Sequence, residues 1–507
     1  KLEEISIATA SHVRNVRAEG LYGGMRFSAD ALALRVDAER LAVEGTGALN
    51  DVPLAMRWIQ EFRPDDGFGQ HFSVGGRLDR ESFARLGLEV PVWITGAVGL
   101  RSDIHIKDDG VVAATVDLDL AQTGLEPPGG FWRKMPGAAA QAAFQVFRTP
   151  SNVIRLDAVE VVAPDLTFRG AVSGSLAGGL ENLEVELLQL GDDRLSGELR
   201  RLDGAAWGLD VAAETLNAEP LVSILRGSTS DEPSDLNLEA AFTFGSLRLD
   251  PAVTVAGASG QLSLVDGHLA RLETTGLVGG TEPLSISVTP RQPDAASGVG
   301  TRDLLVESGD AGAMLTALDL TDALQGGGLR ITASIAPDGQ ATGLLGIDNF
   351  RLTETPTAAR LLSLASLTGI GQAMSGEGLG FVRADVPFRY DGARLNFSGA
   401  RATGPALGIT ADGYVDRDSE EIRLVGNVIP AYSLTRVLGA IPLIGTILGG
   451  DDGIFGVTYL IEGPAAKPTI TVNPLSALAP GILRRMFLEP VDPNQLPEAF
   501  EAPVSDR

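Results

Sequence analysis

The side chains that most often carry catalytic or metal chemistry are sparse in this chain of 507 residues. Its four histidines, His12, His71, His105 and His268, are scattered and lack the spacing of metal ligands. The chain has no cysteine, which removes disulfides, thiolate ligands and cysteine nucleophiles. We therefore expect the histidines to be ordinary surface or strand-edge residues and no metal to be bound.

Two short motifs superficially suggest a ligand. The glycines of Gly376–Gly380 are spaced as in a phosphate-binding loop, but they follow an apolar helical pattern instead of a strand. Asp416, Asp418, Glu420 and Glu421 could hold calcium, but the glycine and spacing of an EF-hand loop are missing. We interpret the first as a helix end and the second as a solvated hairpin tip.

Catalytic motifs are also missing from the sequence. The sequence has no P-loop, no HExxH zinc motif and no GxSxG nucleophile elbow. We therefore predict a protein that is not an enzyme and that needs no cofactor.

The formal net charge is −26 and the pI is near 4.5. Such a field repels nucleic acid, so nucleic-acid binding is excluded as a function. It also disfavours adsorption of the whole surface to anionic lipid heads, so any membrane contact must be local and apolar. No run of 18 apolar residues is present, and none of the chain is expected to cross a bilayer as a helix.

The elements that must position any site are short strands. Apolar and polar residues alternate with a period of two in 112–120, 235–244, 329–335, 382–390, 422–428 and 455–461. One dry face and one wet face are typical of antiparallel sheet. Members of the predicted dry face are Val112, Val116, Leu118, Leu236, Leu238, Phe242, Leu329, Ile331, Val382, Val386, Phe388, Leu424, Val457 and Tyr459.

Turns and helices divide the strands. Hairpin tips are predicted at 108–110, 337–339 and 391–392, where aspartate precedes glycine. Short helices are predicted at four places, 53–62, 136–147, 219–225 and 311–318. Residues 227–233 and 292–300 are expected to be loops, and the acidic tail after Pro490 is expected to be disordered.

Three long stretches near the C-terminal end contain no ionisable side chain: 361–376, 437–450 and 468–483. The first begins as a helix should, with Thr355 as N-cap and Pro356 at the first position, and its leucines surround the helix. The second is interrupted by Pro442 and glycines and suggests an apolar hairpin. The predicted membrane-contact residues are Leu361, Leu364, Leu367, Ile441, Leu443, Ile444, Ile447, Leu448, Arg484 and Arg485. An equally open alternative is that these stretches plug the end of the sheet.

A family resemblance rests on several of these segments. They are Ser308–Leu315, Gly326–Ile331, Ile347–Leu352, Val428–Ser433, Ile441–Leu448 and Val472–Arg484, in this order. Upstream, Leu78–Leu88 and Gly96–Gly99 add to the pattern. The order resembles the C-terminal region of AsmA-like envelope proteins of the YhdP type. The resemblance is specific over about residues 300–488. Over about residues 1–300 only the general character of the sequence is similar.

The resemblance implies a mainly β protein, an elongated curled antiparallel sheet (a repeating β-groove) related in shape to TamB and the chorein-like lipid bridges. It implies a periplasmic conduit for phospholipids between the inner and outer membranes, with acyl chains on the dry face. We accordingly expect a groove body at 1–300, an AsmA-like region at 301–490, more helical than the body, and a tail at 491–507. The chain begins at Lys1 inside a strand pattern, and an inner-membrane anchor is expected in an N-terminal segment absent from it.

Alternation by itself leaves other architectures open. Closed β-sandwiches give the same pattern, and they would suit a non-transporting structural protein of the periplasm that supports outer-membrane assembly. An outer-membrane barrel is disfavoured by the lack of aromatic girdles. A β-helical carbohydrate-active enzyme is disfavoured by the lack of a short repeat.

Overall fold

The computed structural model describes residues 8–21, 24–64, 67–107, 109–127, 132–175, 178–203, 206–218, 236–291, 300–318, 320–353, 378–405, 407–416, 418–430, 457–465 and 468–473. The chain divides into two compact units, Lys1–Leu216 and Asn217–Arg507. The boundary predicted near residue 300 falls inside the second unit, between two strands that pair in register.

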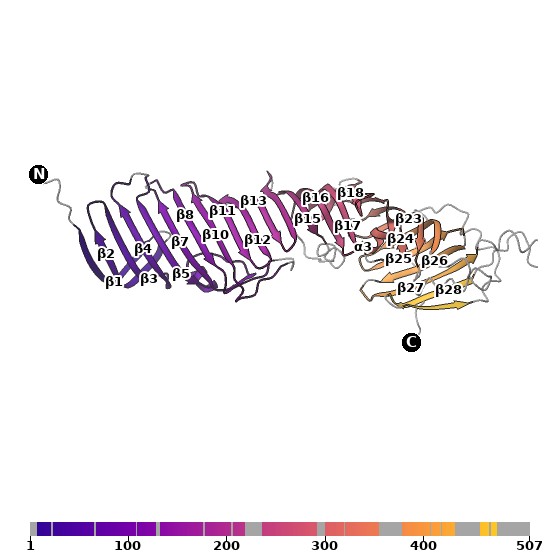
Figure 1. Cartoon of the computed structure of the whole chain (residues 1–507), viewed down its shortest axis with the longest axis horizontal. Coiled ribbons are helices and arrows are strands. Elements are labelled where there is room, and N and C mark those ends of the chain that lie inside the picture. Colours follow the sequence, from indigo (N-terminus) through magenta and orange to yellow (C-terminus); the bar gives the residue numbers. More distant parts are fainter. Residues whose placement is uncertain are drawn as a thin grey trace, which may run out of the picture. The chain divides into compact units, whose positions relative to one another are not determined.

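The first unit is an antiparallel meander in which nearly every strand pairs with the next one along the chain (Figure 1). Its main strands are β1 (Thr9–Leu21), β2 (Met25–Val36), β3 (Arg40–Leu49), β4 (Val52–Glu61), β5 (Gln70–Leu78), β7 (Val98–Ile106), β8 (Val112–Asp119), β10 (Gln141–Arg148), β11 (Val153–Ala163), β12 (Leu166–Ser175), β13 (Gly179–Leu190), β14 (Asp193–Arg201) and β15 (Trp207–Asn217). Helix α1 (Arg80–Arg85) and the small sheet of β6 (Ile94–Gly96) and β9 (Thr123–Leu125) lie in its connections.

The second unit repeats this architecture. Its strands are β16 (Leu238–Asp250), β17 (Val253–Val265), β18 (His268–Val278), β19 (Glu282–Pro290), β20 (Arg302–Ser308), β21 (Leu324–Gln325), β22 (Gly328–Ile335), β23 (Ala341–Leu352), β24 (Leu379–Tyr390), β25 (Arg394–Thr403), β26 (Leu407–Asp416), β27 (Glu421–Pro430), β28 (Val457–Pro464) and β29 (Thr469–Asn473). Helix α3 (Ala311–Ala317) follows β20.

The predicted fold class is confirmed: the described chain is mainly β, a curled antiparallel sheet with short helices. The reason is visible in β8, where Thr115 and Asp117 are exposed while Val116 and Leu118 on the opposite face are half-buried. The three predicted hairpin tips are also confirmed, since they join β7 to β8, β22 to β23 and β24 to β25. At the second tip Gly339 has a φ of 84°, which favours glycine.

Two predicted helices are wrong. Residues 53–62 lie largely in β4 and residues 136–147 largely in β10. In β4, Met56 and Trp58 share a face while Arg57 lies on the other, and pairing with β3 and β5 decides the structure. The helix predicted at 311–318 is confirmed as α3, and the one at 219–225 lies outside the described residues. So do the apolar stretch 361–376, the apolar hairpin and the tail.

Closed sandwiches do not account for the described strands. A sandwich needs two large sheets face to face, whereas each unit here has one main meander, and β6 and β9 form the one further sheet among the described residues. In the first unit few large described side chains are nearly fully buried, Val52 and Leu78 among them, and most apolar residues there are only half-buried. A close-packed core between two sheets would bury many more.

Candidate functional site: an apolar face of aligned rows

Cross-strand register in the first unit aligns apolar side chains into rows. The longest, which we call the first apolar row, takes one residue from each main strand between β2 and β15: Leu34, Val43, Trp58, Phe72, Ile104, Ala114, Val146, Leu156, Val172, Leu183, Leu199 and Leu209. No polar residue interrupts it. At a strand spacing of about 4.8 Å the row extends about 50 Å.

The side chains of the first apolar row are only half-buried, with Val43 at 9% exposure the one buried member. Trp58 and Phe72 stack within the row, with ring centroids 6.1 Å apart. Parallel to it runs a row through Met56, Val74, Val116 and Phe144, in which Ser102 is buried and donates its hydroxyl to the Thr115 carbonyl. Half-buried apolar side chains in register form a continuous face that still meets solvent.

The opposite face of the same strands is polar. Its central row is Glu44, Arg57, Ser73, Asp103, Thr115, Gln145 and Asp157, and nearly all of these residues are exposed. A hollow of 1030 Å³ lies over β5, β7, β8 and β10, and its lining includes Arg101, Asp117, Asp119 and Glu160. These charged residues belong to the polar face by alternation, and the rest of the lining is mostly small or apolar, with Leu100, Leu118 and Val162 the largest aliphatic residues.

The second unit carries a corresponding row, which we call the second apolar row. Its members are Ala240, Leu262, Leu272, Val288, Leu304, Ala333, Gly343, Phe388, Phe397, Gly413, Leu424, Ile461 and Ile470. This face is more covered than the first, because Ala240, Val288, Ala333 and Ile461 are all buried. The row is nevertheless apolar from β16 to β29.

Helix α3 covers one border of this face. Its N-cap is Asp310, whose side chain accepts the Ala313 N–H at 3.0 Å. The helix contacts β16, β17, β21 and β23, and Met314 and Leu315 are buried. The helix therefore covers apolar side chains at one border of this face.

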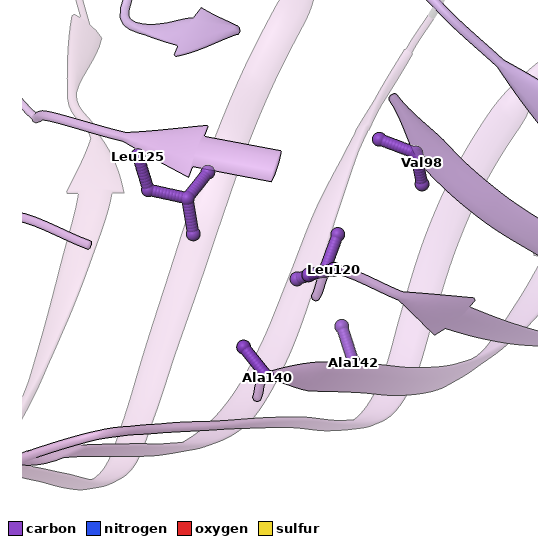
Figure 2. Close-up of a cluster of buried hydrophobic side chains, with 5 residues drawn as sticks. All are labelled: Val98, Leu120, Leu125, Ala140 and Ala142. Atoms are coloured by element: carbon purple, nitrogen blue, oxygen red, sulfur yellow. The ribbon is translucent and has the colours of Figure 1, made fainter. Parts of the chain in front are cut away.

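In the first unit the connecting segments form a comparable border. Figure 2 shows Val98, Leu120, Leu125, Ala140 and Ala142 gathered into one buried cluster, with side chains from β7, β9 and β10 and from the residues beside β8 and β10. Half-buried aromatic and aliphatic residues pack against this cluster, among them Phe83, Trp93, Ile94, Leu118 and Trp132.

A buried lysine holds this border together. Lys134 is 3% exposed, and its Nζ donates to the carbonyls of Leu120 and Thr123, each at 2.8 Å, and to that of Met135 at 3.3 Å. Burial lowers the pKa of Lys134, and the charge of Asp119 partly opposes this shift. The sequence analysis missed this residue, because nothing in its local sequence separates it from a surface lysine.

Most predicted dry-face residues lie on the apolar faces. Half-buried members are Val112, Val116, Leu118, Leu238, Phe242, Ile331, Val386, Phe388 and Leu424. Leu329 and Tyr459 lie there too, but each is 3% exposed and is therefore packed in protein. Tyr459 also donates its hydroxyl to the Thr410 carbonyl at 2.7 Å, and burial raises its pKa. The side chain of Val457 lies outside the described residues.

Two predicted dry-face residues are more exposed than the others. Leu236 is 40% exposed because it precedes the first residue of β16. Val382 is 58% exposed, whereas its neighbour Phe381 is 3% exposed. Opposite Val382 lies Asn349, which has a φ of 54°, and at this point the buried positions of β24 change phase, from Phe381 to Ala384. Phe381 instead stacks on Phe350 with ring centroids 5.2 Å apart.

The predicted membrane-contact residues, from Leu361 to Arg485, all lie outside the described residues. Their role stays a prediction. Within the described helices, none is long and apolar enough to span a membrane.

Two of the four histidines are not scattered in the fold. His71 and His105 pair in register on β5 and β7, and their Nδ1 atoms are 2.5 Å apart. Glu61 lies 3.8 Å from Nε2 of His71. Among the described residues no set of three or more potential ligands is arranged to hold a metal ion.

Within the acidic cluster at 416–421, Asp416 has a structural role. Asp416 accepts the backbone N–H groups of Asp418 and Ser419 and pairs with Arg394 at 2.8 Å. The backbone bond from Ser419 and the Arg394 guanidinium lower the pKa of Asp416 to about 2. The aspartate therefore ties the turn between β26 and β27 to β25.

No protein-family model matches the chain, and no curated protein matches it.

Proposed function

We propose that the chain binds lipid acyl chains along its apolar faces and serves as a conduit for phospholipids between the two membranes of a bacterial envelope. The observation that carries the proposal is the first apolar row, which runs unbroken through consecutive strands while its side chains stay half-buried. Covering apolar surface stabilises a complex by roughly 25 cal/mol per Å². Acyl chains would supply the cover that a second sheet supplies in a sandwich.

Three further features support a conduit over a closed binding pocket. The row has no polar interruption that would fix a ligand at one strand. Its members are mostly Leu, Val, Ile and Ala, which contact chains without directional bonds. The polar face on the other side of the strands, together with a net charge of −26, keeps the sheet soluble while one face is apolar.

The location and the transport role rest on the family resemblance of the sequence. Under this proposal the protein works in the periplasm, and its partners are phospholipids and the inner and outer membranes. It acts without a cofactor and catalyses no reaction.

Site-specific photocrosslinking in lipid-producing cells tests the proposal. A crosslinking amino acid at Val116 or Ile331 should capture phospholipid, and one at the exposed neighbours Thr115 or Thr332 should not. Native mass spectrometry of the purified chain should detect co-purified phospholipid. Equal labelling of both faces, or a lipid-free protein at every position, would contradict the proposal and favour a structural role in the periplasm.

A further inference from the structure

Arg302 is a buried arginine at the border of the apolar face of the second unit. It is the first residue of β20, and two and four residues further along the strand lie Leu304 and Val306. Alternation places all three side chains on one face. Leu304 belongs to the second apolar row and Val306 is buried beside it. The guanidinium of Arg302 is thus attached to the same surface that we propose for acyl chains.

The polar partners of Arg302 are neutral. One Nη donates to the Leu269 carbonyl at 2.5 Å and the other to the Ala336 carbonyl at 3.1 Å. Arg302 is 7% exposed, and its Nε atom is buried with no hydrogen-bond partner. Among the described residues, no carboxylate lies within ion-pair distance of it.

Other arginines of this unit differ. Arg291 pairs with Asp303, Arg330 pairs with Glu307 at 3.2 Å, and Arg394 pairs with Asp416 at 2.8 Å. Each of these guanidinium groups is exposed and neutralised. A buried cation that contacts only carbonyl oxygens has lost its hydration, and no opposite charge compensates for that free-energy cost. Burial accordingly lowers the pKa of Arg302.

We infer that Arg302 holds the phosphate of a lipid headgroup whose acyl chains lie on the adjoining rows at Leu304 and Val306. A guanidinium presents planar paired donors that match the oxygens of a phosphate. Two of its five N–H donors are held by the Leu269 and Ala336 carbonyls, which fix its plane, and three, the Nε–H among them, remain for an anion. This inference rests on the proposed function and adds a headgroup preference to it: phosphate-bearing lipids over neutral lipids with the same chains.

The test is a competition on the whole purified chain. The protein is loaded from detergent with equal amounts of phosphatidic acid and diacylglycerol carrying identical acyl chains, and bound lipid is counted by native mass spectrometry. Phosphatidic acid should be preferred by about tenfold, the change expected for one charge-assisted hydrogen bond. R302Q should abolish the preference. R330Q, on the polar face of the next strand, should keep it.

The outcomes separate the two proposals. If neither lipid binds, the conduit itself is refuted. If both lipids bind equally to the unaltered chain, the conduit stands and the assignment of Arg302 is wrong. Inorganic phosphate is added as a third arm, and competition by phosphate as strong as that of phosphatidic acid would show a site for free anion instead of a headgroup. Where R302Q fails to fold, R302K, which keeps the charge but loses the paired donors, should reduce the preference.

Discussion

Placing a carboxylate at two positions on apolar faces separates an open face from a packed core. Val116 in β8 is half-buried, whereas Val255 in β17, a strand that α3 contacts, is 1% exposed. Burying a valine side chain fully is worth roughly 1.5–3 kcal/mol, and an unpaired buried charge costs more. We expect Val255→Asp to reduce local stability by about 4 kcal/mol or more. Val116→Asp should cost only about 1 kcal/mol, because half of the transfer energy is lost and the new charge stays hydrated.

Amide hydrogen exchange read by mass spectrometry suits this comparison, because long repeated sheets do not unfold as one cooperative unit. The measured quantity is the opening free energy of the amides in β8 and β17. Thr115→Asp and Thr254→Asp are matched controls on exposed neighbouring positions and should change it by less than about 0.5 kcal/mol. If Val116→Asp were as damaging as Val255→Asp, the apolar face of the first unit would be a dry core and the open-face argument would fail.

Three further predictions concern single contacts. Lys134→Met removes the ammonium donor from the Leu120 and Thr123 carbonyls, so exchange protection around them should fall by about 2 kcal/mol, and unchanged protection would show the lysine to be dispensable. Asp416 has a lowered pKa of about 2, so its stabilising effect is complete above its ordinary value of 3.8 and is lost as the pH falls towards 2. Asp416→Asn should therefore flatten the fall in the opening free energy of β25 and β26 from pH 5 to pH 2, measured by hydrogen exchange, and an unaltered fall would contradict the assignment. Gly426→Ala should destabilise β27 in hydrogen exchange, because the new Cβ would lie 1.8 Å from the Thr410 carbonyl oxygen and 2.6 Å from the Tyr459 hydroxyl; a stable variant would show that this close approach can relax.

The sequence by itself determined the fold class. Alternation such as that of Thr115, Val116 and Asp117 follows directly from the two-residue repeat of a strand, and aspartate-glycine turns such as Asp338-Gly339 mark hairpins by local backbone preference. The pattern of residues 311–318 also predicted α3, although a helix of seven residues depends on its packing against the strands for stability.

Tertiary structure decided what local signals leave open. Residues 53–62 look helical alone, and pairing with both neighbours makes them β4. The buried positions of β24 change phase opposite Asn349, which has a positive φ, and Val382 is exposed although its place in the alternation predicts an inward side chain. Lys134 and Arg302 are buried because distant segments supply carbonyl acceptors to them. An apolar strand face is open or packed depending on which segments lie across from it in space. The alternation of residues along one strand does not predict those segments.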